Sequence, residues 1–170
     1  MQDYQLRYEE SKPEVKKYPI CILANDMDMP MNIGSLFRMA DALGVEKIYL
    51  CGKSPSPPRK KINRTARSTV QYVAHEYCEN ALETIGKLRE AGYKIVSLEI
   101  TEQSIDILDF EVQSDEKICL IIGRENRGVE QELLNASDAA VHIRMCGNNS
   151  SMNVAVATAI AVFEITKEMS

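Results

Sequence analysis

Histidine is scarce in this sequence, and the cysteines are not paired. Only His75 and His142 are present, and no motif accompanies them, so a histidine-based catalytic triad has no support. The five cysteines are odd in number, and none stands in a C-x-x-C pair. That pattern argues against both a zinc site and a disulfide framework. We therefore expect a protein without a metal centre.

Long apolar runs are also missing. No stretch approaches the roughly 20 apolar residues that a membrane-spanning helix needs. The N-terminal stretch MQDYQLRYEESKPEVKKYP is polar and lacks the apolar core of a signal peptide. We therefore expect a cytoplasmic protein with no membrane partner. A length of 170 residues predicts one domain over residues 1–170, with residues 1–17 as a lead-in segment.

Positive charge is in deficit overall but concentrated in one place. The formal net charge is −5, which by itself argues against a nucleic-acid partner. Residues 53–67, KSPSPPRKKINRTAR, nevertheless contain basic residues and no acidic ones: Lys53, Arg59, Lys60, Lys61, Arg64 and Arg67. The local field matters more than the total for an anionic ligand. We predict a long loop here, which is either simply solvated or binds nucleic acid.

The pattern of apolar residues predicts strands alternating with helices. Strands are expected over 18–26, 45–52, 69–77, 93–100, 117–123 and 139–145, and helices over 32–44, 80–92, a short stretch after 123 and about 151–168. Asn32 is the expected N-cap of the first helix, and Gly44 its expected stop. Because the central strands are apolar on both faces, we predict an α/β fold with a mostly parallel sheet and helices on both faces. Ligands bind such sheets beyond the carboxyl ends of the strands.

The first strand-to-helix turn, DMDMPMNIGSLFR, carries Asn32, Gly34 and Arg38. Arg38 follows Gly34 by four residues, so both are expected on one face near the start of a helix. A helix N-terminus with an arginine beside it is a ready anion site. The alternative is that Asn32 only caps the helix and that Arg38 is only solvated.

The second turn, GRENRGV, follows a fully apolar strand. Gly123 ends that strand, and the lack of a side chain there would let a ligand approach the backbone. Glu125 lies just beyond the strand end, and Gly128 lets the chain turn back into a helix. The alternative is an ordinary strand–turn–helix junction, and the glycine spacing is not that of a phosphate-binding loop.

The third turn, MCGNNSSMN, leads into the last helix and carries more hydroxyl and amide groups than capping requires, among them Ser150, Ser151 and Asn153. The helix that follows is apolar all round and rich in alanine, so it is expected to be buried on more than one side. Its alanine-rich face suits close packing against a helix of a second subunit. A monomer with a deeply buried terminal helix is the alternative.

Together the three turns resemble the three motifs of the SpoU (TrmH-like) class of SPOUT RNA methyltransferases. The matching stretches are NIGSLFRMADALGV, LIIGRENRGV and IRMCGNNSSMNVAVATAIAVFE, in that order, and the resemblance covers residues 18 to 166. It implies a deep C-terminal trefoil knot, a homodimer with the last helix in its interface, and S-adenosylmethionine as cofactor. The implied reaction is methylation of a ribose 2′-hydroxyl in structured RNA. The departures are Arg144, where many members have proline, and Ala155, where many have serine.

The resemblance also assigns residues position by position. Catalytic and RNA-facing positions are matched by Asn32, Arg38, Glu125, Ser151 and Asn153, and cofactor positions by Leu98, Gly123, Ile143, Ser151 and Met152. We expect the basic segment, with Lys60, Lys61, Arg64 and Arg67, to meet RNA phosphates alongside Arg38.

The family proposal makes the motif 1 arginine, here Arg38, the general base. Because an arginine stays protonated, we instead expect Arg38 to stabilise the forming alkoxide and to anchor a phosphate. A phosphate, water or Glu125 would then accept the proton. The chain length and the SMN sequence favour tRNA over ribosomal RNA as substrate. A non-catalytic RNA-binding member of the same fold and an unrelated doubly wound nucleotide-binding enzyme are the alternatives.

Overall fold

The computed structural model describes residues 14–169, which form one seven-stranded sheet. The strands are β1 (Tyr18–Asn25), β2 (Val45–Cys51), β3 (Ala74–Cys78), β4 (Tyr93–Leu98), β5 (Ile105–Asp106), β6 (Lys117–Ile122) and β7 (Ala139–His142). They lie in the order β3-β2-β1-β6-β4-β7-β5, and neighbouring strands run parallel. The predicted α/β fold is therefore confirmed. The trefoil knot stays a prediction, and residues 1–13 of the expected lead-in lie outside the described residues.

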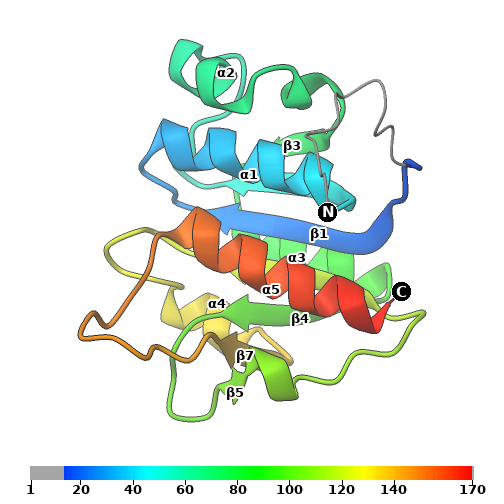
Figure 1. Ribbon diagram of the computed structural model, residues 1–170, viewed down its shortest axis with the longest axis vertical. Helices are drawn as coiled ribbons and strands as arrows, with labels where there is room; N and C mark the ends of the chain where they lie inside the picture. The colour runs from blue at the N-terminus through cyan, green and yellow to red at the C-terminus, as the bar shows by residue number, and fades with distance from the viewer. Residues whose placement is uncertain (1–13, 170) are drawn as a thin grey trace, which may run out of the picture.

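Helices cover both faces of the sheet. They are α1 (Pro30–Ala42), α2 (Lys60–Ala66), α3 (Ala81–Glu90), α4 (Gln131–Asn135) and α5 (Val154–Glu168). Figure 1 shows α1 and α5 in front of the sheet and α3 and α4 behind it. The buried apolar residues accordingly form two cores, one beneath α1, α2 and α5 and the other beneath α3 and α4.

The strand order decides which loops meet. Because all strands are parallel, their carboxyl ends share one edge of the sheet. The central strands β1, β6, β4 and β7 are neighbours, so the segments that follow them converge at that edge. These segments are the start of α1, the 123–128 turn, residues 99–100 and the 143–153 segment. The three motif turns are thus brought together by topology, although they are far apart in the chain.

Two of the expected element boundaries were wrong for an identifiable reason. Asn32 is not an N-cap, since α1 begins at Pro30 with Met29 at the cap position. Proline suits the first helical position because its φ is already helical and its missing N–H would be unpaired there. The predicted strand over 69–77 begins instead with a 3₁₀ turn over Thr69–Gln71, and only Ala74–Cys78 pairs with β2.

The basic segment 53–67 was predicted to be a long loop, but part of it forms the helix α2. This helix packs on α1 through Ile62 and Ala66, both fully buried, against Gly34. A Cβ atom on Gly34 would lie 2.6 Å from Thr65 Cβ and 2.9 Å from the Ile62 carbonyl oxygen. The absence of a side chain at Gly34 therefore permits the close approach of the two helices.

Other boundaries were close to expectation. Gly44 follows α1 with φ +69°, a conformation that favours glycine, so its predicted role as the stop of this helix is confirmed. The last helix begins at Val154, with Asn153 as its N-cap. The two-residue strand β5 was not predicted. No helix within residues 14–169 is long and apolar enough to cross a membrane, and this part of the chain contains no cluster of three metal-ligating side chains.

Candidate active site

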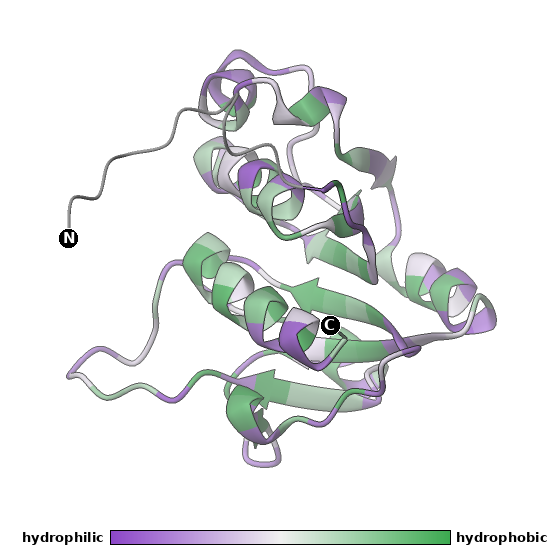
Figure 2. Cartoon of the chain, turned by 45° about the vertical axis from the view of Figure 1, so that its right-hand side comes forward, coloured by the Kyte–Doolittle hydropathy of each residue, from purple (hydrophilic) through white to green (hydrophobic). Residues whose placement is uncertain are grey.

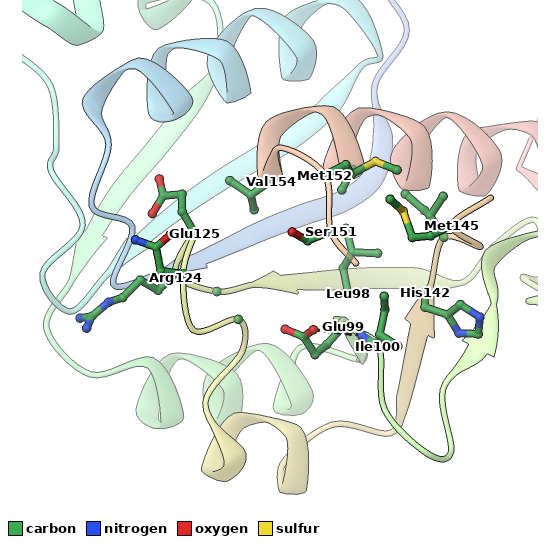
Figure 3. A pocket seen from close by; sticks show the side chains of 15 residues that line it. Leu98, Glu99, Ile100, Arg124, Glu125, His142, Met145, Ser151, Met152 and Val154 are labelled. Atoms are coloured by element: carbon green, nitrogen blue, oxygen red, sulfur yellow. Dashed lines mark hydrogen bonds between the residues drawn. The ribbon is translucent and has the colours of Figure 1, made fainter. Parts of the chain in front are cut away.

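A cavity of about 260 Å³ lies at the carboxyl ends of β4, β6 and β7. All five residues predicted to surround a cofactor line it: Leu98, Gly123, Ile143, Ser151 and Met152. Figure 3 shows side chains from three separate segments facing this space, including Leu98, Ser151, Met152 and Met145. A second hollow over residues 147–149 shares Met145, Ser151 and Met152 with the cavity and extends it toward solvent.

The turn after β6 explains why residue 123 is glycine. The Arg124 N–H donates to the Gly128 carbonyl at 3.0 Å, and the Gly128 N–H donates back to Arg124 at 2.8 Å. A Cβ atom on Gly123 would collide with the Gly128 backbone. Gly128 has φ +69°, where a side chain would be strained. The glycines are therefore needed to close this turn, which differs from the predicted reason that a ligand approaches the backbone.

Three predicted catalytic residues form a hydrogen-bonded chain beside the cavity. The Asn32 amide donates to Glu125 Oε1 at 2.8 Å, and the Asn153 amide donates to Asn32 Oδ1 at 3.0 Å. Asn153 Oδ1 accepts the backbone N–H groups of Ala155 and Val156, which caps α5. Asn32 is buried, with 7% of its surface exposed. One chain of side chains thus ties the starts of α1 and α5 to the 123–128 turn.

Glu125 anchors the backbone just before α1, whose first turn has no side-chain cap. Its carboxylate accepts the backbone N–H of Asp28 at 3.0 Å and that of Met29 at 3.2 Å, besides the Asn32 amide. Burial acts to raise the pKa of Glu125, but these hydrogen bonds to the ionised form outweigh it and leave the pKa below its ordinary value. A carboxylate held in this way is a weak base. Of the expected proton acceptors, Glu125 is therefore the one that the geometry disfavours.

Arg38 lies outside this cluster. It is exposed on α1 and makes no hydrogen bond or ion pair with residues 14–169, and it does not line the cavity. Gly34 is buried beneath α2, so part of the face that it shares with Arg38 is covered, and the anion site expected there stays a prediction. The predicted RNA-binding residues Lys60, Lys61, Arg64 and Arg67 are all exposed on or next to α2.

Several lining residues were not predicted. Glu99 directly follows β4, and its carboxylate accepts the Val129 N–H at 2.8 Å and the Ile100 N–H at 3.0 Å. His142 ends β7, and its Nδ1 atom is buried without a hydrogen-bond partner among residues 14–169. Glu99 and His142 both lie at strand ends, and this position was the available sequence signal for a role in the site. No local motif identified either residue. Ser151 lines the cavity but takes no part in the hydrogen-bonded chain Glu125–Asn32–Asn153.

Comparison with known proteins shows that this chain is similar to RNA methyltransferases. The model of the SpoU rRNA Methylase family matches residues 19–163. A protein of Borreliella burgdorferi described as an uncharacterized tRNA/rRNA methyltransferase is 28% identical over 155 residues, which are 91% of this chain and 67% of that protein. The tRNA (guanosine(18)-2′-O)-methyltransferase of Aquifex aeolicus is 26% identical over 156 residues, which are 91% of this chain and 72% of that enzyme.

A solved structure supports the same relationship. The AdoMet-bound rRNA methyltransferase from Sinorhizobium meliloti superposes with a TM-score of 0.83 at 25% identity. The similarity covers 93% of this chain and 59% of that one. This chain spans about two thirds of the length of the first curated relatives it matches.

Proposed function

This chain belongs to the SpoU rRNA Methylase family, and on that premise we propose that it methylates a ribose 2′-hydroxyl of tRNA with S-adenosylmethionine as donor. The observation that carries the proposal is the hydrogen-bonded chain Glu125–Asn32–Asn153, which joins the three family motifs at the rim of one cavity. The A. aeolicus relative is named as a tRNA 2′-O-methyltransferase, which supports tRNA over ribosomal RNA. A non-catalytic RNA-binding member of the same fold would have no need of that cavity.

The cavity suits S-adenosylmethionine in its chemistry. Its walls include Leu98, Ile100, Ile143, Met145 and Met152, which offer apolar contact to an adenosine. Carboxylates and backbone groups near the apolar wall are available for its hydroxyl and amino groups. When bound, the cofactor supplies a methyl group on a sulfonium centre. At about 260 Å³ the cavity is small for a nucleoside, but the adjoining hollow extends it.

The protein's own residues contribute position and electrostatics to the reaction. The chain Glu125–Asn32–Asn153 fixes the starts of α1 and α5, so that the 2′-oxygen can be held in line with the transferring methyl group. Because Glu125 is held as a stable anion, the 2′-hydroxyl proton leaves to a substrate phosphate or to water. Arg38 stabilises the developing alkoxide through its charge rather than by accepting the proton.

We further propose a homodimer built on α5. Val156 and Phe163 are each 53% exposed and Ile160 is 37% exposed, which is unusual for large apolar side chains on one helix. Figure 2 shows that most of α5 is hydrophobic. Since α1 packs beside α5, a partner docked on this face would also lie close to α1, the helix that carries Arg38. A site shared between two subunits is consistent with the position of Arg38 outside the cavity of its own chain.

The RNA would lie across α2 and the exposed face of α1. Lys60, Lys61, Arg64 and Arg67 are exposed there and have no acidic neighbours in the 53–67 segment. Such side chains release counterions from RNA phosphates on binding, which makes affinity depend on salt. The packing of Gly34 against α2 holds this basic helix at a fixed position relative to the motif 1 residues.

The test is transfer of labelled methyl from S-adenosylmethionine to tRNA and, separately, to ribosomal RNA, followed by nuclease digestion and identification of the labelled nucleoside. We expect a 2′-O-methyl nucleoside in the tRNA fraction. Label only in ribosomal RNA would change the substrate and keep the reaction. Absence of both label and cofactor binding would refute the proposal in favour of a non-catalytic RNA-binding protein.

The role of Arg38 is tested with Arg38→Lys. This variant keeps the charge but loses the planar guanidinium, and we expect turnover to fall at least about tenfold, with unchanged cofactor affinity and stability. Near-normal turnover would show that the geometry of the guanidinium does not matter.

A further inference from the structure

One wall of the cavity is attached to the edge of the sheet by an ion pair. Arg144 Nη2 lies 2.9 Å from Asp106 Oδ2. Arg144 stands between Ile143 and Met145, both of which line the cavity, but it does not itself line it. Asp106 belongs to β5, the two-residue strand at the end of the sheet. The pair therefore joins the cavity wall to an element that does not line the cavity.

The register of the strands explains why these two residues meet. Asp106 is the partner of His142 in the parallel pairing of β5 with β7. Arg144 lies two residues beyond His142, the end of β7, and from there its side chain reaches Asp106. Beyond His142 the chain leaves β7 and enters the segment that leads to Ser151. The ion pair thus acts just where the ladder of backbone hydrogen bonds ends.

The two partners differ sharply in their exposure to solvent. The Asp106 side chain is 7% exposed, while that of Arg144 is 70% exposed. Asp106 Oδ1 accepts the Leu108 N–H at 3.1 Å and so fixes the 3₁₀ turn after β5. Asp106 Oδ2 has no hydrogen bond within residues 14–169, since the arginine contact is close but poorly aligned. Removing the arginine would leave a buried carboxylate oxygen without any compensating charge, which is costly.

We propose that Arg144 and Asp106 form a latch that holds the wall segment 143–145 in its ligand-binding position and thereby sets the affinity for the cofactor. Neither residue contacts the cofactor in this account, so both are positioning residues. A strand with two paired residues contributes little order by itself. The latch ties β5, the turn after it and the cavity wall into one unit. The part that concerns the cofactor rests on the proposed function, whereas the ordering of the wall does not.

The first experiment measures hydrogen–deuterium exchange in the protein without cofactor. We expect Arg144→Ala to increase exchange over residues 105–108 and 143–146 and to leave the remaining strands unchanged. Lys47→Ala is the matched control, because Lys47 pairs with Glu76 at 2.7 Å and joins the opposite edge strand, β3, to its neighbour. If Arg144→Ala leaves exchange in both segments as in the wild type, the latch does not exist.

The second experiment measures the Kd of S-adenosylmethionine by calorimetry. We expect Arg144→Ala to raise the Kd about five- to tenfold, since ordering of the wall must then accompany binding. Lys47→Ala should leave the Kd unchanged. Failure of the wild-type protein to bind the cofactor would refute the proposed function, while the exchange experiment would still decide the latch. Increased exchange with an unchanged Kd would refute the link to affinity.

A double-mutant cycle identifies the partner. Asp106→Asn keeps an acceptor for the Leu108 N–H but removes the charge that Arg144 pairs with. We expect Asp106→Asn combined with Arg144→Ala to bind no more weakly than Arg144→Ala alone. Additive losses would show that Arg144 acts through some other residue. Because Arg144 is exposed, its variant should fold even if the buried Asp106 variant does not.

Discussion

Asn32→Asp would replace the amide that donates to Glu125 with a second carboxylate. The Asn32 amide nitrogen lies 2.8 Å from Glu125 Oε1, and Asn32 is buried. Two ionised carboxylates at that distance would repel each other by about 6 kcal/mol at an effective dielectric constant near 20. Protonation of one of the two carboxyl groups costs less free energy than this repulsion. The introduced carboxyl group, once protonated, could then donate to Glu125 as the amide does. The variant is therefore expected to fold with one extra proton at neutral pH.

The size of the penalty follows from the cost of that proton. An aspartate with an ordinary pKa near 3.9 in the unfolded chain must be protonated in the fold, which costs about 4 kcal/mol at pH 7 and about 1.5 kcal/mol at pH 5. The pKa of the new pair is raised by folding, so the penalty disappears as pH falls. In the wild type the pKa of Glu125 is lowered, so its contribution to stability is present above the unfolded pKa and is lost only in more acidic solution. The two proteins should thus converge in stability by about 2.7 kcal/mol between pH 7 and pH 5.

The assay is urea unfolding of both proteins at several pH values and one fixed protein concentration, because dimerisation would make stability depend on concentration. Asn80→Asp is the matched control, because Asn80 is the exposed N-cap of α3 and its side-chain oxygen accepts the Glu83 N–H. Aspartate caps a helix as well as asparagine does, so this variant should change stability by about 1 kcal/mol or less and without a trend from pH 7 to pH 5. A difference between Asn32→Asp and wild type that stays constant over this range would show that the Asn32 amide does not donate to an ionised Glu125.

Three further predictions concern the surfaces around the site. Gly34→Ala should lower the free energy of unfolding by about 1–3 kcal/mol, because the added Cβ meets the backbone of α2. This loss outweighs the better helix propensity of alanine. Thermal unfolding measures the effect, and an unchanged or higher melting temperature would contradict the packing argument. Replacing Lys60, Lys61 and Arg64 with alanine should weaken RNA binding and reduce the slope of log K against log salt by about 2–3; a slope equal to that of the wild type would place the RNA elsewhere. Phe163→Asp should yield a monomer in analytical ultracentrifugation with its fold intact, since that side chain is half exposed, whereas a variant that still dimerises would place the interface on another face.

The sequence by itself determined the class of fold, and it predicted which residues form the site. Apolar runs such as KICLII can be buried on both faces only in a sheet covered by helices. The motif residues Asn32, Glu125 and Asn153 were assigned through the resemblance of three turns, in order, to the motifs of one family. Local signals also located the stop of α1 at Gly44, where φ is positive.

Tertiary structure decided the rest, because the relevant partners are distant in the chain. Glu125 accepts the N–H groups of Asp28 and Met29 from more than 90 residues away, so no spacing rule along the chain could have identified it as the partner of the segment before α1. Gly34 is small because another helix passes over it, a requirement that only the packed structure creates. The Arg144–Asp106 pair likewise depends on the register between β5 and β7. Hydrogen bonds, close contacts and ion pairs of this kind act at short range in space, and spacing along the sequence does not record them.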